Sequence, residues 1–486
     1  MPQVSRRGVL VGILGLGTAG GLATLKLNSN PHYLGLADIQ ARESALAWSG
    51  KIKSFELIAQ QREIDLGGRI ARTWVYGDSL PGKTIRVNKS DRVKVSFANE
   101  LLVPTSVHWH GLAIRNDMDG VPGITTPEVL PSSSFDFDFI PPDAGTYWFH
   151  PHSGTQLDRG LYSPLIVDDP QEVARYDQEW ILVLDDWTDG VGKNPDEILA
   201  DLRRGHGNSS SMPGMDMGSS NGMDSGDVTY PLYLINGRPT NDPDLLTARP
   251  GDRIRIRIIN AAADTIFHVA LSEHIMTVTH SDGFPVKPYS TSLLRIGMGE
   301  RYDAVVTLKD GVFPLVADPM GKADIARALI RTGEGRVPNS AYRPRELMDI
   351  PLTVDRLQST NDVRLPMRKP DRVHDLVLNG SMRPYEWRIN GGMYPHTKPL
   401  DIKEGELGRL RIRNMTMMYH PIHVHGHTFQ IGSAGGPGAR KDTVLLPPMG
   451  SVNVDFQATN PGKWMVHCHN AYHAEAGMMT RLEYIA

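Results

Sequence analysis

The residues with the clearest chemistry lie near the end of the chain, where residues 467–478 read HCHNAYHAEAGM and include the single cysteine, Cys468. A thiolate with histidines nearby and a methionine ten positions on matches a blue-copper centre. Such a centre has two histidines and one cysteine in a trigonal plane, with a weak axial methionine. If the segment is a strand, Cys468 faces one side while His467 and His469 face the other. We therefore expect this segment to connect two metal sites, with Cys468 in one and His467 and His469 in the other. Such an arrangement suits electron transfer from one copper to others.

Three other segments carry histidines at the spacing of strand residues. In residues 420–425, which read HPIHVH, His423 and His425 share one face of a strand and His420 falls on the other. We therefore expect His420 to lie with Cys468, and His423 and His425 to lie with the histidines that flank it. The blue-copper set would be His420, Cys468, His473 and Met478, and eight further imidazoles, enough for a metal cluster, would be His108, His110, His150, His152, His423, His425, His467 and His469.

Each of these motifs, taken alone, has a simpler interpretation. A histidine pair is typical of hydrogen-bonded core or surface positions, and an isolated Met478 is typical of a hydrophobic core. Zinc is the usual metal of cysteine and histidine clusters, but zinc sites favour several cysteines or an open site with three ligands. One cysteine with ten clustered histidines therefore indicates copper.

Three similar segments indicate how the chain is divided. Residues 91–99 read DRVKVSFAN, residues 252–260 read DRIRIRIIN and residues 406–414 read ELGRLRIRN. Each starts with an acidic residue, ends in asparagine and alternates apolar with polar residues, which predicts a half-buried strand. The segments are separated by the length of a domain, so we expect three all-β domains of one kind.

A second repeat relates the first and last domains. Residues 134–152 read SFDFDFIPPDAGTYWFHPH and residues 451–469 read SVNVDFQATNPGKWMVHCH, with the serine, the glycine and both histidines at matching offsets. Pro151 stands between the histidines in the first copy, and Cys468 in the last. The matching part of the middle domain, residues 316–318, has no histidine. We expect the middle domain to be a spacer without copper, and the cluster to lie between the first and third domains.

These motifs, in this order, resemble those of the three-domain multicopper oxidases, the family of laccases and bacterial copper-efflux oxidases. The resemblance covers nearly everything after about residue 50. It implies an all-β fold of three cupredoxin-like Greek-key β-sandwich domains and an enzyme that couples oxidation of a donor to the reduction of O2 to water. We expect a signal or anchor with its leader at residues 1–45, and the cupredoxin domains at 46–172, 173–348 and 349–486.

The resemblance also implies four copper ions and their ligands. The split between Cys468 and its two neighbours follows from strand geometry as well, which leaves the choice between type 2 and type 3 open. By resemblance, type 1 copper is held by His420, Cys468, His473 and Met478; type 2 by His108 and His423; one type 3 copper by His110, His150 and His469; and the other by His152, His425 and His467.

Two acidic residues are candidates for proton delivery to O2. Asp119, eleven residues after His108, matches the family acid beside the copper cluster, where it would orient ligands and relay protons. Its alternative role is a turn residue, since Asp followed by Gly is a common turn. The second family acid directly follows the type 1 histidine, and here Ala474 stands there. Glu475 is the candidate substitute, although a shift of one residue along a strand would change its face.

Methionines suggest where an electron donor binds. Residues 208–227 are rich in serine and glycine and predict a flexible loop, in which soft thioethers suit Cu(I). A neutral linker is the alternative. Met417 and Met418 precede His420 and either line the approach to type 1 copper or simply pack, and Thr416 stands where copper-efflux oxidases have an acid. The loop methionines are Met212, Met215, Met217 and Met223.

The donor decides between several functions. Cu(I) is the expected donor, which would make the protein a copper-detoxification enzyme. A laccase-like oxidase of phenols, or of Fe(II) or Mn(II), is the alternative. A non-enzymatic copper carrier or cupredoxin scaffold is a further alternative of another class, but scaffolds that resemble this family have lost copper ligands, whereas this chain keeps all twelve.

Composition and the first residues indicate the compartment. The net charge is −4 and there is no basic stripe, so nucleic acid is not an expected partner. Arg6 and Arg7 precede residues 8–25, which carry no charge and many glycines. This pattern resembles a twin-arginine export signal, with a membrane anchor or a Sec signal as alternatives. We expect a periplasmic, extracellular or membrane-anchored cell-envelope protein, and the sequence leaves the oligomeric state open.

Overall fold

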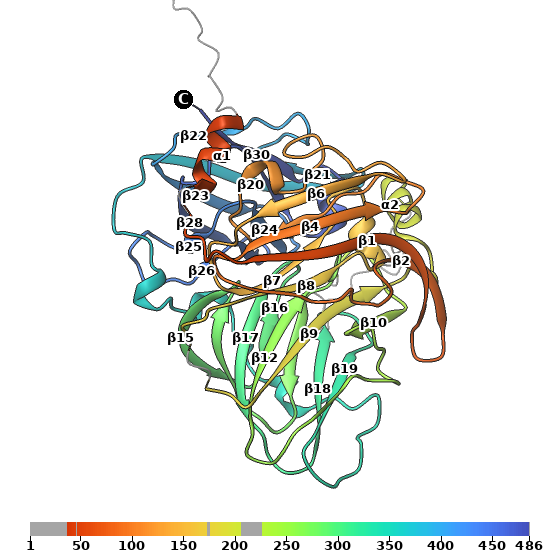
Figure 1. Cartoon of the computed structure of the whole chain (residues 1–486). Helices are drawn as coiled ribbons and strands as arrows, with labels where there is room; N and C mark the ends of the chain where they lie inside the picture. The colour runs from red at the N-terminus through yellow and green to blue at the C-terminus, as the bar shows by residue number, and fades with distance from the viewer. Residues whose placement is uncertain (1–35, 45, 173–174, 206–225, 486) are drawn as a thin grey trace, which may run out of the picture. The chain divides into compact units, whose positions relative to one another are not determined.

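The computed structural model describes residues 36–44, 46–172, 175–205 and 226–485. In this part of the chain the strands form six sheets, and helices are few and short (Figure 1). The predicted all-β fold is therefore confirmed, whereas the domain boundaries stay a prediction. No described helix is long and apolar enough to cross a membrane. The helices are α1 (Leu36–Ser44), α2 (Pro195–Arg203) and α3 (Ala471–Glu475), with 3-10 turns η1 (Asn116–Met118), η2 (Gln156–Arg159), η3 (Arg345–Met348), η4 (Val354–Arg356) and η5 (Asn361–Val363).

Two four-stranded sheets come from the first part of the chain, in the orders β2-β1-β4-β6 and β3-β8-β7-β5. β4 alternates buried and exposed residues, as the sequence predicts, because one face packs on the core and the other meets water. Trp109 of β5 and Phe137 of β6 meet within that core. The strands are β1 (Ile52–Asp65), β2 (Ile70–Tyr76), β3 (Ile85–Asn88), β4 (Arg92–Asn99), β5 (His108–His110), β6 (Ser134–Phe139), β7 (Gly145–His150) and β8 (Ser163–Asp168).

The middle part forms sheets in the orders β10-β9-β12-β17-β14-β15 and β11-β19-β18-β13-β16. β12 is buried on both faces, so the prediction of a half-buried strand is wrong there. Its arginines Arg255 and Arg257 are buried because both pair with Asp303 of β17. The strands are β9 (Gln178–Trp187), β10 (Leu232–Ile235), β11 (Leu245–Thr247), β12 (Arg253–Asn260), β13 (Phe267–Leu271), β14 (Met276–Ser281), β15 (Phe284–Thr291), β16 (Leu294–Ile296), β17 (Arg301–Thr307), β18 (Val312–Pro319) and β19 (Ala326–Arg331).

The last part forms sheets in the orders β21-β20-β23-β28-β25-β26 and β22-β30-β29-β24-β27. β24 and β29 are central neighbours in the second of these sheets, which places two histidine motifs side by side. The strands are β20 (Arg372–Met382), β21 (Tyr385–Ile389), β22 (Leu400–Ile402), β23 (Leu407–Asn414), β24 (His420–Val424), β25 (Phe429–Ile431), β26 (Arg440–Lys441), β27 (Thr443–Leu446), β28 (Ser451–Gln457), β29 (Lys463–Cys468) and β30 (Met479–Tyr484).

The asparagine that ends each repeated segment has the same role in all three copies. Its side-chain oxygen accepts a hydrogen bond from the backbone N–H two residues later. Its amide donates to two backbone carbonyls, one in the following loop and one 30 to 36 residues further along the chain. In the third copy, Asn414 donates to Met418 O at 2.6 Å and to Pro447 O at 2.9 Å. Asn414 therefore holds the loop that leads directly into His420.

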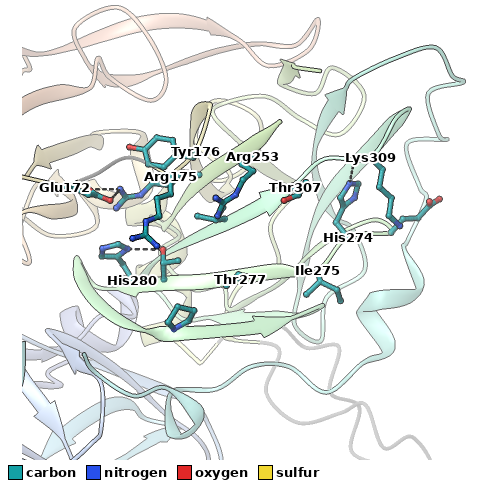
Figure 2. Close-up of a pocket in the computed structure, with 15 residues that line it drawn as sticks. Glu172, Arg175, Tyr176, Arg253, His274, Ile275, Thr277, His280, Thr307 and Lys309 are labelled. Atoms are coloured by element: carbon teal, nitrogen blue, oxygen red, sulfur yellow. Dashed lines mark hydrogen bonds and ion pairs between the residues drawn. The ribbon is translucent and has the colours of Figure 1, made fainter. Parts of the chain in front are cut away.

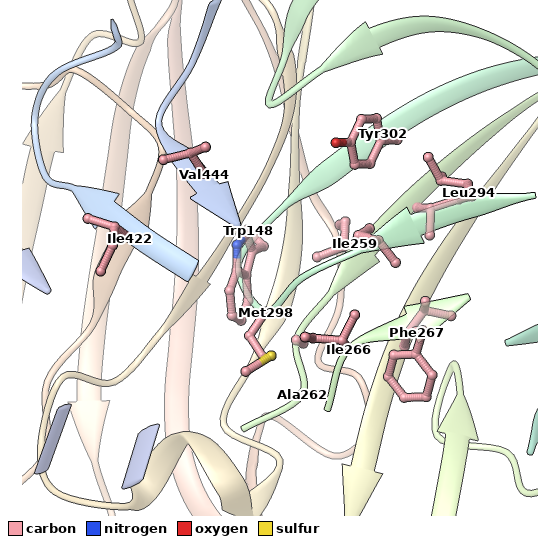
Figure 3. Packing of buried hydrophobic residues seen from close by; sticks show 14 of the residues in the cluster. Trp148, Ile259, Ala262, Ile266, Phe267, Leu294, Met298, Tyr302, Ile422 and Val444 are labelled. Atoms are coloured by element: carbon pink, nitrogen blue, oxygen red, sulfur yellow. The ribbon is translucent and has the colours of Figure 1, made fainter. Parts of the chain in front are cut away.

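One hydrophobic cluster includes residues from all three parts, although most of the core of the first part is a separate cluster. Trp148 of β7, Ile259 of β12 and Ile422 of β24 belong to one buried cluster, together with Met298 and Val444 (Figure 3). Burial of apolar surface is the main favourable term in folding. Because these residues come from all three parts, the same burial holds the strands that carry the histidines against one another.

Candidate metal centre

His420, Cys468 and His473 form a compact group. The Cys468 Sγ atom lies 3.6 Å from His420 Nδ1 and 3.7 Å from His473 Nδ1, and the two Nδ1 atoms are 3.1 Å apart. All three side chains are fully buried. α3 brings His473 back toward the cysteine, because the Asn470 side chain caps this helix by accepting from the backbone N–H of His473. Two imidazoles and one thiol therefore converge as a trigonal copper site requires.

The outer nitrogens of the two imidazoles have different partners. His420 Nε2 lies 2.8 Å from the Thr416 hydroxyl, and His473 Nε2 lies 3.0 Å from Asp227 Oδ2. Because a carboxylate accepts, Nε2 of His473 carries a proton, and Nδ1, which faces Cys468, is the nitrogen left for a metal to bind in place of a proton. Burial by itself would lower the pKa of His473, but Asp227 and Cys468 raise it to about 10. Sequence reasoning missed Asp227, since nothing local connects it to a histidine 246 residues away.

The methionines that the sequence places beside this group differ in exposure. Met478 is fully buried, and its backbone carbonyl accepts from the N–H of Cys468 at 3.0 Å. Met417 is 63% exposed, whereas Met418 is partly buried. Because a bound ion or molecule is held among partly buried side chains, Met418 is better placed than Met417 to contact one.

Two equivalent strand pairs carry the remaining histidines. His108 of β5 pairs with His150 of β7, and His423 of β24 pairs with His467 of β29. The potential ligand atoms lie within 4.8 Å of one another in each of three groups: His108, His110 and His423; His110, His150 and His469; and His152, His425 and His467. The eight imidazoles therefore lie together, and their division among individual coppers stays a prediction.

Hydrogen bonds show which nitrogens are left for a metal. His467 Nδ1 donates to Cys468 O at 2.8 Å, and His425 Nδ1 donates to Asp119 Oδ2 at 3.1 Å. Both Nε2 atoms then carry lone pairs, yet they face each other at 3.0 Å. Two lone pairs at that distance repel unless a cation lies between them. In addition, Nε2 of His108, His150 and His423 is buried without a hydrogen-bond partner among the described residues. The donor set thus fits bound metal, and its chemistry fits copper.

Burial favours the neutral form of seven imidazoles in this cluster, which is the form that binds metal. Removal from water disfavours the charged form, and neighbouring imidazoles disfavour it further. The pKa is lowered by burial for His110, His150, His152, His423, His425, His467 and His469.

Two buried aspartates contact the histidine cluster. Asp119 accepts from His108 Nδ1 through its backbone carbonyl at 2.8 Å, and its carboxylate reaches His425. Asp442 accepts from His423 Nδ1 through its backbone carbonyl at 3.0 Å, and its carboxylate lies 3.3 Å from His110 Nε2. The sequence indicates Asp119 but not Asp442. The place of Asp442 beside the cluster follows from the pairing of β27 with β24, which the sequence does not display.

The middle part of the chain contributes to this centre without supplying a ligand. Arg301 of β17 makes two hydrogen bonds to the carboxylate of Asp442, at 2.7 and 2.6 Å. Gly299 approaches the cluster so closely that a Cβ atom there would lie 2.9 Å from the ring of His469. None of the metal-ligand groups found in the described residues includes a residue of β9–β19. The middle part, which the sequence predicts to be a spacer, therefore also contacts the histidine cluster and the aspartate beside it.

Other candidate residues lie elsewhere or are not described. Glu475 is the last residue of α3, so the argument based on strand faces is wrong for this position. Its backbone carbonyl accepts from Arg203, and burial raises the pKa of its carboxyl. The loop methionines Met212, Met215, Met217 and Met223, as well as Arg6 and Arg7, lie outside the described residues.

A hollow of about 640 Å³ on the middle part has a different character (Figure 2). It is lined by several charged side chains, including Arg175, Arg253 and Lys309, and by His274 and His280. Its residues do not include any member of the histidine groups described above. The hollow is therefore separate from the candidate metal centre.

Comparisons with known proteins agree with this geometry. Family models described as multicopper oxidase match residues 58–172, 178–335 and 365–485. The multicopper oxidase MmcO of Mycobacterium tuberculosis is 48% identical over 99% of this chain and 97% of its own length. A copper resistance protein A homolog of Pseudomonas syringae is 27% identical over 87% of this chain and 91% of its own length. The crystal structure of Fet3p, a multicopper oxidase that functions in iron import, has a TM-score of 0.78 at 20% identity and covers 89% of this chain and 90% of that chain.

Proposed function

Because the chain belongs to the multicopper oxidase family, we propose that it oxidises Cu(I) with O2 and thereby protects against copper. In balanced form, four Cu(I) ions, four protons and one O2 would give four Cu(II) ions and two waters. The observation that carries this proposal is the place of the His420, Cys468 and His473 group. It adjoins the eight-histidine cluster on one side and Met418, whose thioether suits Cu(I), on the other.

We assign four resident coppers to the groups of side chains described above. Bound copper would supply the one-electron chemistry and the reduction of O2. The two classes of site are joined through the chain itself, because Cys468 is covalently linked to His467 and His469. Type 1 copper would be held by His420, Cys468, His473 and Met478; type 2 by His108 and His423; and the two type 3 coppers by His110, His150 and His469, and by His152, His425 and His467.

Asp119 is the proposed proton donor. Its carboxylate lies between two cluster histidines, 3.3 Å from His108 Nδ1 and 3.1 Å from His425 Nδ1. Oδ1 receives no hydrogen bond from any residue that the structure describes. A buried carboxylate with a free oxygen can take up a proton and pass it on. Glu475 stays a weaker candidate, since its described contacts are with Arg203 and not with a histidine.

The deciding experiment is O2 uptake by the copper-loaded protein with Cu(I) or a simple phenol as the sole donor. A higher kcat/KM for Cu(I) is the expected result. A higher value for the phenol would make the protein laccase-like instead. No uptake with either donor, from protein that carries its full copper content, would contradict oxidase activity and favour a carrier or scaffold.

The methionine-rich segment is proposed to deliver Cu(I). Deletion of residues 208–223 would remove all four of its methionines and leave Asp227, the partner of His473, in place. We expect Cu(I) oxidation to fall relative to phenol oxidation. An equal fall with both donors would mean that the segment has a structural role.

Export by the twin-arginine route is also proposed, on the basis of Arg6 and Arg7 before an uncharged stretch. Replacing both with lysine should keep the protein, or a reporter fused to residues 1–45, inside the cell. Continued export of this variant would exclude the route.

A further inference from the structure

The hollow on the middle part of the chain carries an excess of positive charge that the fold does not use (Figure 2). Three of the side chains that line it, those of Arg175, Arg253 and Lys309, make no hydrogen bond or ion pair with any described residue. Among its lining carboxylates, only that of Glu273 is likewise without a partner in the described part of the chain. We propose that the hollow is a binding site for a small molecule that carries a diphosphate group. This inference is independent of the proposed oxidation.

The floor of the hollow is formed by neighbouring strands of one sheet. Arg253 of β12 lies opposite Thr307 of β17, and both side chains are exposed. Thr277 of β14, the next strand of the sheet, also lines the hollow. Figure 2 shows Arg175 and Arg253 on one side of Thr307 and Lys309 on the other. Cations from separate segments therefore face the hollow, with hydroxyl donors between them.

The internal repeat shows that Arg253 lacks a partner that its counterpart has. Arg253 is the second residue of its repeated segment, and Arg92 is the second residue of the first copy. Arg92 makes two hydrogen bonds to the carboxylate of Asp138, at 2.6 and 3.0 Å. Thr307 lies opposite Arg253 and offers no such anion. Since the guanidinium fork fits carboxylate and phosphate alike, the fork of Arg253 is left for an anion that the chain does not supply.

The charges at the inner side of the hollow are neutralised within the protein. Arg255, whose side chain is 3% exposed, makes two hydrogen bonds to Glu172 at 2.8 and 3.0 Å. It makes two more to Asp303, at 3.0 and 2.6 Å. Because Glu172 is already paired with a cation, it repels an incoming anion less than a free carboxylate would.

The two histidines of the hollow do not make it a metal site. His274 donates from Nδ1 to Ser272 O at 2.7 Å and accepts at Nε2 from the backbone N–H of Lys309 at 3.0 Å, so neither nitrogen is left for a metal. His280 Nδ1 lies 3.0 Å from the Thr279 hydroxyl. Neither histidine belongs to a metal-ligand group found in the described residues. The chemistry of the hollow is therefore that of an anion site.

Size and charge together indicate the class of ligand. The volume of about 640 Å³ falls in the range of small-molecule sites, roughly 300–1,000 Å³. A phosphate group carries about two negative charges near neutral pH, so linked phosphates match several unpaired cations better than a single carboxylate does. Tyr176 and Ile275 also line the hollow and offer apolar surface to an organic part of the ligand.

Calorimetric titration of the copper-loaded protein with pyrophosphate and with ADP, at low ionic strength, tests this site. We expect one molecule to bind per chain. In Arg175→Gln/Arg253→Gln the affinity should fall at least about tenfold, because charge-assisted hydrogen bonds to phosphate are lost. Both arginines are exposed and unpaired in the described chain, so the fold should persist. Since phosphates also bind free Cu(II), the copper content would be measured before and after each titration.

The matched control is Arg336→Gln/Arg383→Gln, which makes the same change of net charge at exposed arginines outside the hollow. It should keep the affinity of the wild type. Tighter binding of ADP than of pyrophosphate would identify an organic diphosphate as the ligand, and equal or weaker binding of ADP an inorganic one. Equal weakening in both variants would mean that only the overall charge attracts phosphate, which overturns the site. Failure of both probes to bind the wild type below about 1 mM would overturn it as well.

Discussion

Asp119 and Asp442 occupy matching places at two ends of the histidine cluster, but their surroundings differ. Each accepts from the Nδ1 atom of a histidine through its backbone carbonyl, and each holds its carboxylate 3.3–3.4 Å from the same nitrogen. Asp442 is in addition paired with Arg301 by two hydrogen bonds. Asp119 has an oxygen without a hydrogen-bond partner in the described part of the chain. One carboxylate is thus held by two hydrogen bonds from an arginine, whereas the other has no arginine or lysine partner among its described hydrogen bonds and ion pairs.

The charge of the arginine explains the difference. Burial by itself would raise the pKa of Asp442, but Arg301 outweighs burial and lowers it below the usual range. The carboxylate also accepts from the Thr443 hydroxyl at 2.8 Å, and Thr443 reaches two histidines. Asp442 is therefore suited to orienting ligands, whereas the role of Asp119 in proton delivery stays a proposal.

The largest expected effect comes from breaking the Arg301–Asp442 pair. Arg301→Met would leave a fully buried carboxylate without its partner, which typically costs about 3–5 kcal/mol. The thermal unfolding midpoint of the metal-free protein would reveal this loss. Arg411→Met, which breaks an ion pair with Asp375 whose side chains are 52% and 43% exposed, should cost at most about 1 kcal/mol. Similar losses in both variants would contradict a special role for the buried pair.

The next effect distinguishes Asp119 from Asp442 by the rate at which O2 reoxidises the reduced enzyme. Asp119→Asn keeps the size of the side chain and removes its charge, so reoxidation of the reduced enzyme by O2 should slow roughly 10–100-fold. Copper content and reduction of the blue centre by the donor should change little. Asp442→Asn should instead lose copper and stability, because Arg301 would lose the carboxylate to which it makes two hydrogen bonds and keep only Asp282, 3.7 Å away. Stopped-flow reoxidation combined with copper analysis measures both effects, and equal behaviour of the two variants would remove the distinction.

A smaller effect is expected from removing the Thr443 hydroxyl, which lies beside Asp442. Thr443 Oγ1 lies 3.0 Å from His423 Nδ1 and 3.2 Å from His110 Nε2. Thr443→Val should weaken copper binding roughly tenfold, measured by competition with a chelator. Thr443→Ser keeps the hydroxyl and serves as the control. Equal weakening in both variants would mean that packing of the methyl group matters instead.

The smallest effect is expected for Asp303, which pairs with two arginines as Asp442 pairs with one, but contacts no histidine of the cluster. Burial by itself would raise the pKa of Asp303, but Arg255 and Arg257 lower it far below its usual range. A carboxyl whose folded pKa is lowered contributes stability above its unfolded pKa and loses that contribution as the pH falls.

The metal-free protein should accordingly lose roughly 1 kcal/mol from this group between pH 5 and pH 3. Asp303→Asn should show a shallower dependence of the unfolding midpoint on pH, although its stability is lower throughout. An unchanged slope would mean that Asp303 does not take up the proton in this range.

Much of the candidate site could be predicted because its residues lie close together in the sequence. The two-residue period of a strand is enough to separate Cys468 from His467 and His469. In the structure β29 ends at Cys468, and both histidines fall in other histidine groups than the cysteine does. The three repeated segments also form matching strands, each ending at its asparagine. Two expectations were wrong for local reasons. β12 is central in its sheet and buries its arginines against Asp303, and Glu475 lies in a helix that Asn470 caps.

The sequence by itself determined the all-β class and the three-part plan, and it indicated which histidines lie with Cys468 and which lie together, because strand periodicity and repeated motifs act over short distances. Only the tertiary structure decided which residues from distant segments support these sites. Arg301 reaches Asp442 across 141 residues, and Asp227 reaches His473 across 246. Such contacts depend on how sheets pack against one another. No local pattern encodes that packing, so the partners of the ligands became visible only in the folded chain.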